Sequence, residues 1–233
     1  MEERPLLFRG GSNSGGSGSG GVTPATHLQS PRPGDTYNYT LSGKLQGVGT
    51  NVSYSFTDSL VAGYSQTNYS GVNVLIANYA YNLNLSNGQS IAVNTQYVES
   101  SDTSGDVMAY GFSQNGALAT YNPPIIDLPA AWSNTLSLDQ QTTTSSGVSD
   151  VVISSVVGAE NVSTPIGNFA CSKVNYSENT STSTNTNGTL WYPPEMGAAP
   201  IKLSETVTLV GSDGNTYTGT VNGVLSSTNV PIS

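Results

Sequence analysis

Residues 72–98 read VNVLIANYAYNLNLSNGQSIAVNTQYV, and this stretch decides the fold. Apolar and polar residues alternate over its first half, which is the period of a β-strand with one buried face. The expected buried face consists of Leu75, Ala77, Tyr79, Tyr81, Leu83 and Leu85. Asn87 and Gly88 then give a two-residue turn signal, after which the alternation resumes at Ile91, Val93, Thr95 and Tyr97. The stretch therefore predicts an antiparallel β-hairpin.

Short alternating runs bounded by turn residues continue on both sides of this hairpin. They predict strands at residues 37–41, 52–56, 106–113, 133–139, 150–157, 168–176, 190–192, 202–210 and 216–224. Asp213 and Gly214 mark a hairpin turn between the last two. A convincing helical stripe is missing throughout, although residues 128–132 could hold one short helical turn. Because a sheet of roughly ten hairpin-linked strands twists and curls, we predict an all-β fold with a curved antiparallel sheet: a half-barrel, a barrel or a sandwich.

The first 33 residues differ in composition from the rest. Residues 10–21 are almost entirely Gly and Ser, which predicts a flexible coil, and three prolines follow between residues 22 and 34. Met1 to Gly10 carries Glu2 and Glu3 where a signal peptide needs positive charge. We therefore expect a disordered Gly/Ser-rich N-terminal tether over residues 1–33 and a single antiparallel β domain over residues 34–233.

Charge is scarce and mostly negative. Charged residues make up 9% of the chain, and the formal net charge is −9. From residue 34 onward the only basic residues are Lys44, Lys173 and Lys202, so most carboxylates cannot be ion-paired and are expected in water. Nucleic acid is excluded as a partner because phosphate binding needs clustered basic residues. A surface rich in Ser, Thr and Asn favours an extracellular or cell-envelope location, and the lack of a long apolar run excludes a transmembrane helix.

The residues offer little chemistry. The single histidine, His27, lies in the tether, which argues against a serine triad and a zinc site. The single cysteine, Cys171, sits in an alternating run and is expected to be a small buried residue. A carboxylate-dependent glycoside hydrolase would draw its pair from Glu99, Glu160, Glu178, Glu195 and Glu205, but the sequence does not bring any two together. We therefore expect no catalytic residue, no metal, no cofactor and no enzymatic activity.

Aromatic residues are the remaining candidates for binding. The chain has thirteen tyrosines and two tryptophans, which could pack the sheet or line a sugar or lipid site. Trp191 and Tyr192 adjoin two prolines, a combination typical of an exposed sheet edge. We take Trp191, Tyr192 and Trp132 as candidate ligand-binding residues.

Two segments carry a family resemblance. They are TPIGNFACSKV at residues 164–174 and LWYPPEMGA at residues 190–198. Together they resemble the TPxGxFxCxKV and WYxPExG pair of uncharacterised bacterial envelope proteins and lipoproteins. That group is similar to domains of unknown function whose half-barrels resemble periplasmic lipoprotein carriers. The resemblance implies a curved antiparallel sheet and an envelope location, and no catalytic residues.

Three functions follow as expectations. The first is a non-enzymatic secreted or envelope protein that binds a partner, a lipid or a glycan. The second is a structural subunit of an extracellular filament, self-associating when the N-terminal segment donates a strand to a neighbouring sheet. The third, least favoured, is the carboxylate-dependent glycoside hydrolase.

Overall fold

The chain folds into a closed antiparallel β-barrel. The computed structural model describes residues 30–69, 71–102, 104–114, 117–131, 133, 136–181, 185–193 and 199–230. These residues form twelve strands and no helix, so the all-β prediction is confirmed and the barrel is selected among its three forms. No described helix has the length and apolar character needed to cross a membrane. Residues 1–29 of the predicted tether lie outside the described residues.

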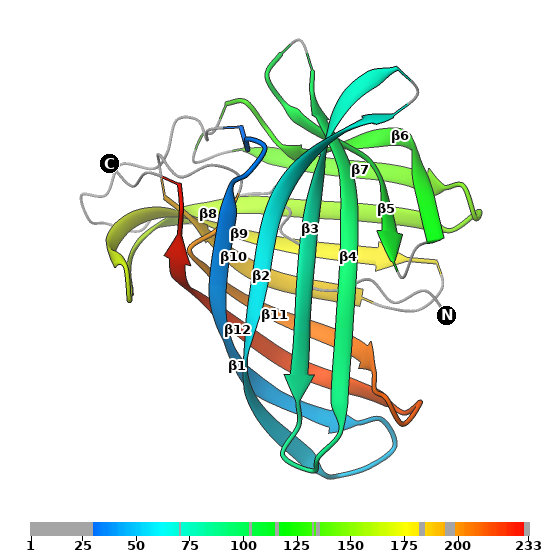
Figure 1. Cartoon of the computed structure of the whole chain (residues 1–233), viewed down its shortest axis with the longest axis vertical. Coiled ribbons are helices and arrows are strands. Elements are labelled where there is room, and N and C mark those ends of the chain that lie inside the picture. The colour runs from blue at the N-terminus through cyan, green and yellow to red at the C-terminus, as the bar shows by residue number, and fades with distance from the viewer. Residues whose placement is uncertain are drawn as a thin grey trace.

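The strands follow one another around the barrel in sequence order. They are β1 (Thr36–Gly47), β2 (Ser53–Tyr69), β3 (Val72–Asn84), β4 (Ser90–Ser101), β5 (Val107–Gln114), β6 (Ala117–Leu128), β7 (Ser137–Thr144), β8 (Ser149–Thr164), β9 (Gly167–Thr180), β10 (Asn185–Tyr192), β11 (Lys202–Val210) and β12 (Thr216–Thr228). Each strand pairs with its neighbours in sequence, and β1 also pairs with β12, which closes the sheet. The barrel consists of two walls whose strands cross steeply (Figure 1). Strand β1 bends from the wall containing β2, β3 and β4 into the wall containing β9 to β12 (Figure 1).

Four hairpin turns share one hydrogen-bond pattern, which explains the turn residues in the sequence. In the β3–β4 turn the Leu85 amide donates to the Gln89 carbonyl, and the Gly88 amide donates to the Leu85 carbonyl. The same two bonds recur in the turns at 102–106, 144–148 and 211–215. The fourth residue of each turn is a glycine with positive φ, as at Gly88 and Gly214. The hairpins predicted at residues 87–88 and 213–214 are therefore confirmed, although five residues, 85–89, rather than two join β3 to β4.

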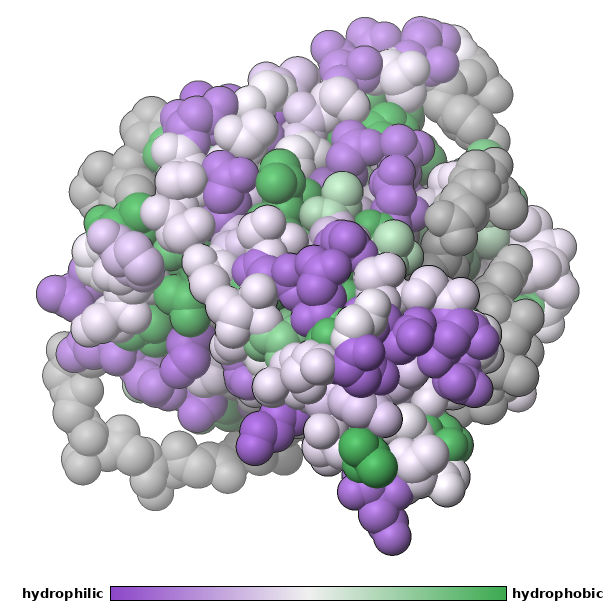
Figure 2. All heavy atoms as spheres, turned by 60° about the horizontal axis from the view of Figure 1, so that its bottom comes forward, coloured by the Kyte–Doolittle hydropathy of each residue, from purple (hydrophilic) through white to green (hydrophobic). Residues whose placement is uncertain are grey.

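The barrel interior holds the hydrophobic core. Alternation places Ala77, Tyr79, Tyr81 and Leu83 of β3 inside, as predicted, and Leu85 in the following turn is also buried, while Leu75 is only half-buried. The largest fully buried side chains are Tyr37, Tyr39, Tyr192, Leu41, Leu45, Leu60, Leu83, Ile91 and Ile125. Figure 2, which brings the lower end of the barrel forward, shows apolar residues as separate spots among polar ones. Scattered exposed apolar residues are normal on a protein surface and define no docking face.

Strand β6 is the element that sequence reasoning missed. Pro123 and Pro124 interrupt it and lack the amide hydrogens of a regular ladder, so its backbone pairing with β7 is limited to two residue pairs. Side chains of β7 replace the missing bonds: the Gln140 amide group bonds both the amide and the carbonyl of Ile126, at 2.7 and 2.9 Å. The Thr142 hydroxyl donates to the Pro123 carbonyl at 2.6 Å.

Two further predictions for this part of the chain were wrong. The strand predicted at residues 133–139 begins and ends later, as β7, and the short helical turn predicted at 128–132 is absent from its described residues. The prolines of β6 misdirected both expectations, because a proline pair reads as a break in a strand.

Close backbone approach at two glycines allows β1 and β12 to pair. A Cβ on Gly219 would lie 2.1 Å from the Lys44 carbonyl oxygen, and one on Gly43 would lie 2.1 Å from the Thr220 carbonyl oxygen. Both distances are far inside van der Waals contact. Barrel closure therefore requires residues without a side chain at these positions.

We predict that Gly219→Ala destabilises the barrel by about 3 kcal/mol, since overpacking against backbone atoms cannot be relieved by a rotamer change. The matched control is Gly63→Ala in β2, where the nearest atoms to a new Cβ are 3.8 Å away. Urea denaturation of the three proteins measures the difference. Equal stability of the two variants would contradict this account of closure.

Candidate functional site

The outer face of one wall carries aligned rows of hydroxyl and amide side chains. Cross-strand register places one row through Asn175, Thr189, Ser204, Asn222, Ser42 and Thr57. The next row runs through Ser177, Asn187, Thr206, Thr220, Lys44 and Ser55. These positions alternate with buried ones, so their side chains point outward. We call them the outer rows.

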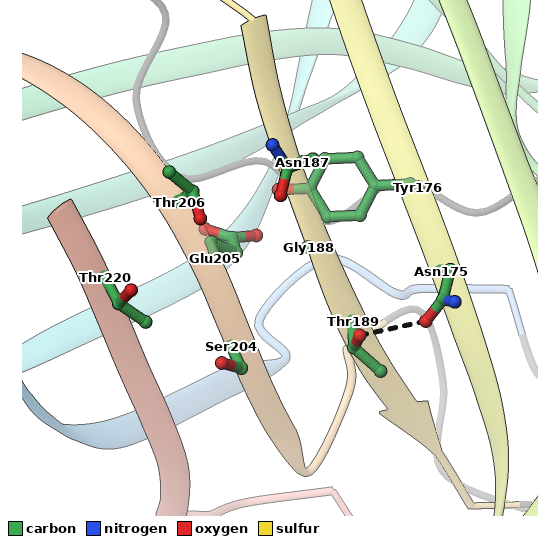
Figure 3. Close-up of a pocket in the computed structure, with 9 residues that line it drawn as sticks. All are labelled: Asn175, Tyr176, Asn187, Gly188, Thr189, Ser204, Glu205, Thr206 and Thr220. Carbon is green, nitrogen blue, oxygen red and sulfur yellow. Dashed lines mark hydrogen bonds between the residues drawn. The ribbon is translucent and has the colours of Figure 1, made fainter. Parts of the chain in front are cut away.

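Two adjoining hollows lie in this wall and share Thr220. The first has a volume of about 390 Å³ and is lined by Asn175, Tyr176, Asn187, Gly188, Thr189, Ser204, Glu205, Thr206 and Thr220 (Figure 3). The second has a volume of about 480 Å³ and is lined by Gly43, Lys44, Gln46, Ser53, Thr218, Gly219, Thr220 and Asn222. Together they form a polar groove from β9 across β12 to β2, which we call the outer-wall groove.

A glycine shapes the first hollow. Gly188 occupies an inward position of β10 between Tyr176 on β9 and Glu205 on β11. A Cβ there would lie 2.7 Å from the Tyr176 ring and 2.9 Å from Glu205 Cγ, so these two side chains take the space that a β10 side chain would fill. Figure 3 shows the Tyr176 ring reaching from β9 across β10 toward Glu205. The floor of the hollow is thus backbone, with a tyrosine and a carboxyl packed behind it.

The Glu205 carboxyl is held in its neutral form. It is 1% exposed, and neither oxygen has a hydrogen-bond partner of good geometry. Burial raises its pKa to about 8; the Tyr176 hydroxyl beside it opposes the rise, and the Glu178 carboxyl adds to it. At neutral pH this group therefore adds no negative charge behind the groove.

Glu205 belongs to a set of five buried acidic residues, which corrects the expectation that such groups lie in water. The set consists of Glu99, Asp127, Asp150, Glu178 and Glu205, none more than 6% exposed. Tyr192 lies among three of them: burial raises its pKa most, followed by Asp127, Glu205 and Glu99. No lysine or arginine among the described residues is buried with them. Because every second side chain of a strand points into the barrel, an acidic residue at such a position is buried along with its apolar neighbours.

Two of the three predicted site residues face opposite sides of the sheet. Trp191 points to the outer face of β10, whereas Tyr192 points into the barrel and is fully buried. Trp132 lies outside the described residues. The exposed aromatic corner expected from the neighbouring prolines is therefore not seen at Trp191, which is only 6% exposed.

Trp191 instead organises a charged cluster at one end of the outer rows. It pairs across the sheet with Lys173 and Lys202, whose ammonium groups lie 5.4 and 4.3 Å from its ring centroid. Its indole nitrogen donates to Glu160 Oε2 at 3.1 Å, and Lys173 Nζ lies 3.2 Å from the same oxygen. The indole bond and the nearby lysines hold the pKa of Glu160 below its usual value.

The two segments that carry the family resemblance meet at this cluster. Residues 164–174 form the β8–β9 turn and the start of β9, and Lys173 and Ser172 pair with Trp191 and Tyr192. Cys171 lies beside them and is fully buried, as expected from the sequence.

The arrangement supports binding better than catalysis. Every outer-row side chain in the groove offers hydroxyl, amide or ammonium groups, which hydrogen-bond a ligand but do not activate a nucleophile. Sequence reasoning missed the groove because it depends on which strands are neighbours. The one signal available was Gly188 within the alternating run 185–192, since an isolated strand glycine marks close backbone approach.

Comparison with known proteins gives fold likeness only. No protein family matches the sequence, and no curated protein does. Among solved structures, the chain is similar to a candidate exported protein with a YmcC-like fold from Bacteroides fragilis, at 15% identity and a TM-score of 0.43, covering 88% of this chain and 100% of that one. It is also similar to a candidate lipoprotein from Parabacteroides distasonis, at 13% identity and a TM-score of 0.39, covering 89% of this chain and 100% of that one. Likeness at this level assigns no ligand or activity.

We predict that stability falls as pH rises from about 4.5 to about 8, because the folded state keeps the Glu205 proton that the unfolded chain releases. This contribution to stability is fully present below the lower pH and fully lost above the upper one, and the loss amounts to about 5 kcal/mol. Glu205→Gln, a neutral analogue, removes this part of the pH dependence. Urea denaturation between pH 4 and 9 tests it, and an unchanged pH profile in the variant would contradict the assignment.

We predict that Cys171 is inert toward thiol reagents in the folded protein. Burial, reinforced by Glu160 and opposed by Lys202, raises the pKa of its thiol to about 12. At pH 8 only roughly one molecule in 10,000 then carries the reactive thiolate. A disulfide-exchange reagent should label the thiol in urea but not in native buffer, and labelling within minutes of the native protein would show that the residue is accessible.

Proposed function

We propose that this chain is a non-enzymatic binding protein of the cell envelope or the extracellular space, and that its outer-wall groove binds a glycan. The observation that carries the proposal is the groove itself: two adjoining hollows on one wall, whose outward-facing lining consists of Asn, Ser, Thr and Gln side chains together with Lys44. Hydroxyl and amide groups both donate and accept hydrogen bonds, which matches the alternating donors and acceptors of sugar hydroxyls.

A lipid ligand is less well supported. Lipid chains need an apolar lining, and the outer-row side chains of both hollows are polar. Most described tyrosines, such as Tyr39 and Tyr192, are packed inside the barrel, and the exposed Tyr110 lines neither hollow. Of the three expected classes of ligand, which are a partner, a lipid and a glycan, we therefore retain the glycan.

Hydrolysis of a glycan is also less well supported. Glu99, Glu178 and Glu205 are each 1% exposed, so a sugar chain on the surface cannot reach them. Glu160 is ion-paired with Lys173, and Glu195 lies outside the described residues. A glycosidase needs two reachable carboxyl groups about 5 to 10 Å apart across its substrate.

Assembly by strand donation lacks an acceptor in the described part of the chain. The β1–β12 pairing closes the sheet and leaves no free edge there, whereas a donated strand needs one. The donor segment itself lies outside the described residues.

The envelope or extracellular location rests on composition. Charged residues make up only 9% of the chain, and the exposed groups of the outer rows are amides and hydroxyls. A location outside the cytoplasm also gives a glycan-binding surface access to cell-surface and matrix polysaccharides. The predicted location agrees with the descriptions of the two similar structures.

A glycan array followed by calorimetry on the best ligand tests the proposal. Thr206→Val replaces a groove hydroxyl by a methyl group and should weaken binding roughly fivefold, the effect of about 1 kcal/mol. Thr67→Val in β2 is the matched control, because Thr67 is exposed and does not line either hollow. Failure of every glycan to bind, or equal losses in both variants, would contradict the proposal.

A further inference from the structure

The outer rows are free of acidic residues although the protein is acidic. Beyond the two rows given above, a row passes through Lys173, Trp191, Lys202, Val224, Thr40 and Ser59. Another passes through Thr208, Thr218, Gln46 and Ser53. The chain has 15 Asp and Glu residues and six Lys and Arg. None of the acidic residues falls in these rows, so the described outward positions of β9 to β12, β1 and the start of β2 carry no negative side chain. The exposed Asp213 lies outside the rows, in the β11–β12 turn.

The lysines lie on this same wall. Lys44, Lys173 and Lys202, the three basic residues after residue 33, all belong to the outer rows. Lys44 lines the second hollow, and Lys202 lies in the row next to Ser204 of the first hollow. Glu160 on β8 stands at the border and is paired with Lys173. The lysine side chains of the β domain are therefore gathered on the wall that carries the groove.

The spacing of the lysines suits an extended ligand. Lys202 lies four residues along β11 from Thr206, or about 13 Å, and Thr206 is separated from Lys44 by two strand spacings, or about 10 Å. The two lysines are therefore about 16 Å apart at the backbone. A single small anion cannot contact both, whereas a polymer with repeated negative groups can lie across the groove and meet each.

The floor of the groove is compatible with a negative ligand. Glu205 and its neighbours Tyr176, Glu178 and Tyr192 lie inside the barrel, each at most 4% exposed. Because burial keeps the Glu205 carboxyl neutral at pH 7, the acid nearest the groove does not repel an anion.

We infer that the ligand of the outer-wall groove is an acidic polysaccharide, bound by hydrogen bonds to the Asn, Ser and Thr side chains and by Lys44 and Lys202 at two points along its length. This inference rests on the proposed function and narrows its ligand class. Hydrogen-bond donors and acceptors recognise the sugar rings, and the ammonium groups select chains that carry carboxylate, sulfate or phosphate groups.

Matched polysaccharides test the inference. Polygalacturonate and its methyl ester share one backbone and differ in charge, and hyaluronan and its carboxyl-reduced form give a second pair. Calorimetry at 50 mM salt should show the acidic member of a pair binding at least tenfold more tightly, with affinity falling as salt is raised. Lys44→Gln and Lys202→Gln should each weaken the acidic ligand about fivefold and leave the neutral one unchanged. Arg32→Gln, an exposed basic residue outside the outer rows, is the matched control.

Each outcome separates the two proposals. Equal binding of acidic and neutral members overturns this inference and leaves the glycan proposal standing. Failure of both members of both pairs, together with failure of the glycan array, overturns both. Equal binding to double-stranded DNA would show a general affinity for polyanions and would overturn recognition of an acidic polysaccharide. Loss of binding in Arg32→Gln would place the site elsewhere.

Discussion

The structure depends on the pairing of β1 with β12. Eleven residue pairs join the first strand to the last, and Gly43 and Gly219 let the two backbones approach closely enough to form them. This closure removes the sheet edge, fixes which side chains face inward, and brings β1 and β2 next to β9 to β12. The outer-wall groove crosses this junction, so closing the barrel also builds the groove.

Alternation accounts for most of what the sequence could predict. Tyr37, Tyr39 and Leu41 are buried because a two-residue period in β1 left no other face for them. The same period explains the burial of Glu99, Glu178 and Glu205, which the scarcity of charge had suggested would be exposed. Strand β6 escaped prediction because the side chain of Gln140 substitutes for a backbone ladder, and a single sequence cannot show such long-range bonds. The groove escaped for a related reason, since Thr206, Thr220 and Lys44 become neighbours only through register.

The two faces of the wall carry opposite electrostatics. Inside, five acidic side chains pack among tyrosines, and burial raises the pKa of Glu205 so that its neutral form is favoured. Outside, lysines and neutral polar groups form the surface. Two neighbouring residues of β10 lie on the two faces of the wall. The Trp191 ring contacts Lys173 and Lys202 outside, and Tyr192 lies near the buried acids inside. Two of the candidate site residues chosen from the sequence, Trp191 and Tyr192, thus lie near the groove, although Trp191 offers no open ring face for stacking.

Hydrogen exchange with and without a bound polysaccharide tests most directly that the outer wall is the binding surface. The account predicts slowed exchange in peptides from β9 to β12 and from β1, with the largest change around residues 187–189, 204–206 and 218–222. Protection confined to β3, β4 and β5, on the other wall of the barrel, would contradict it.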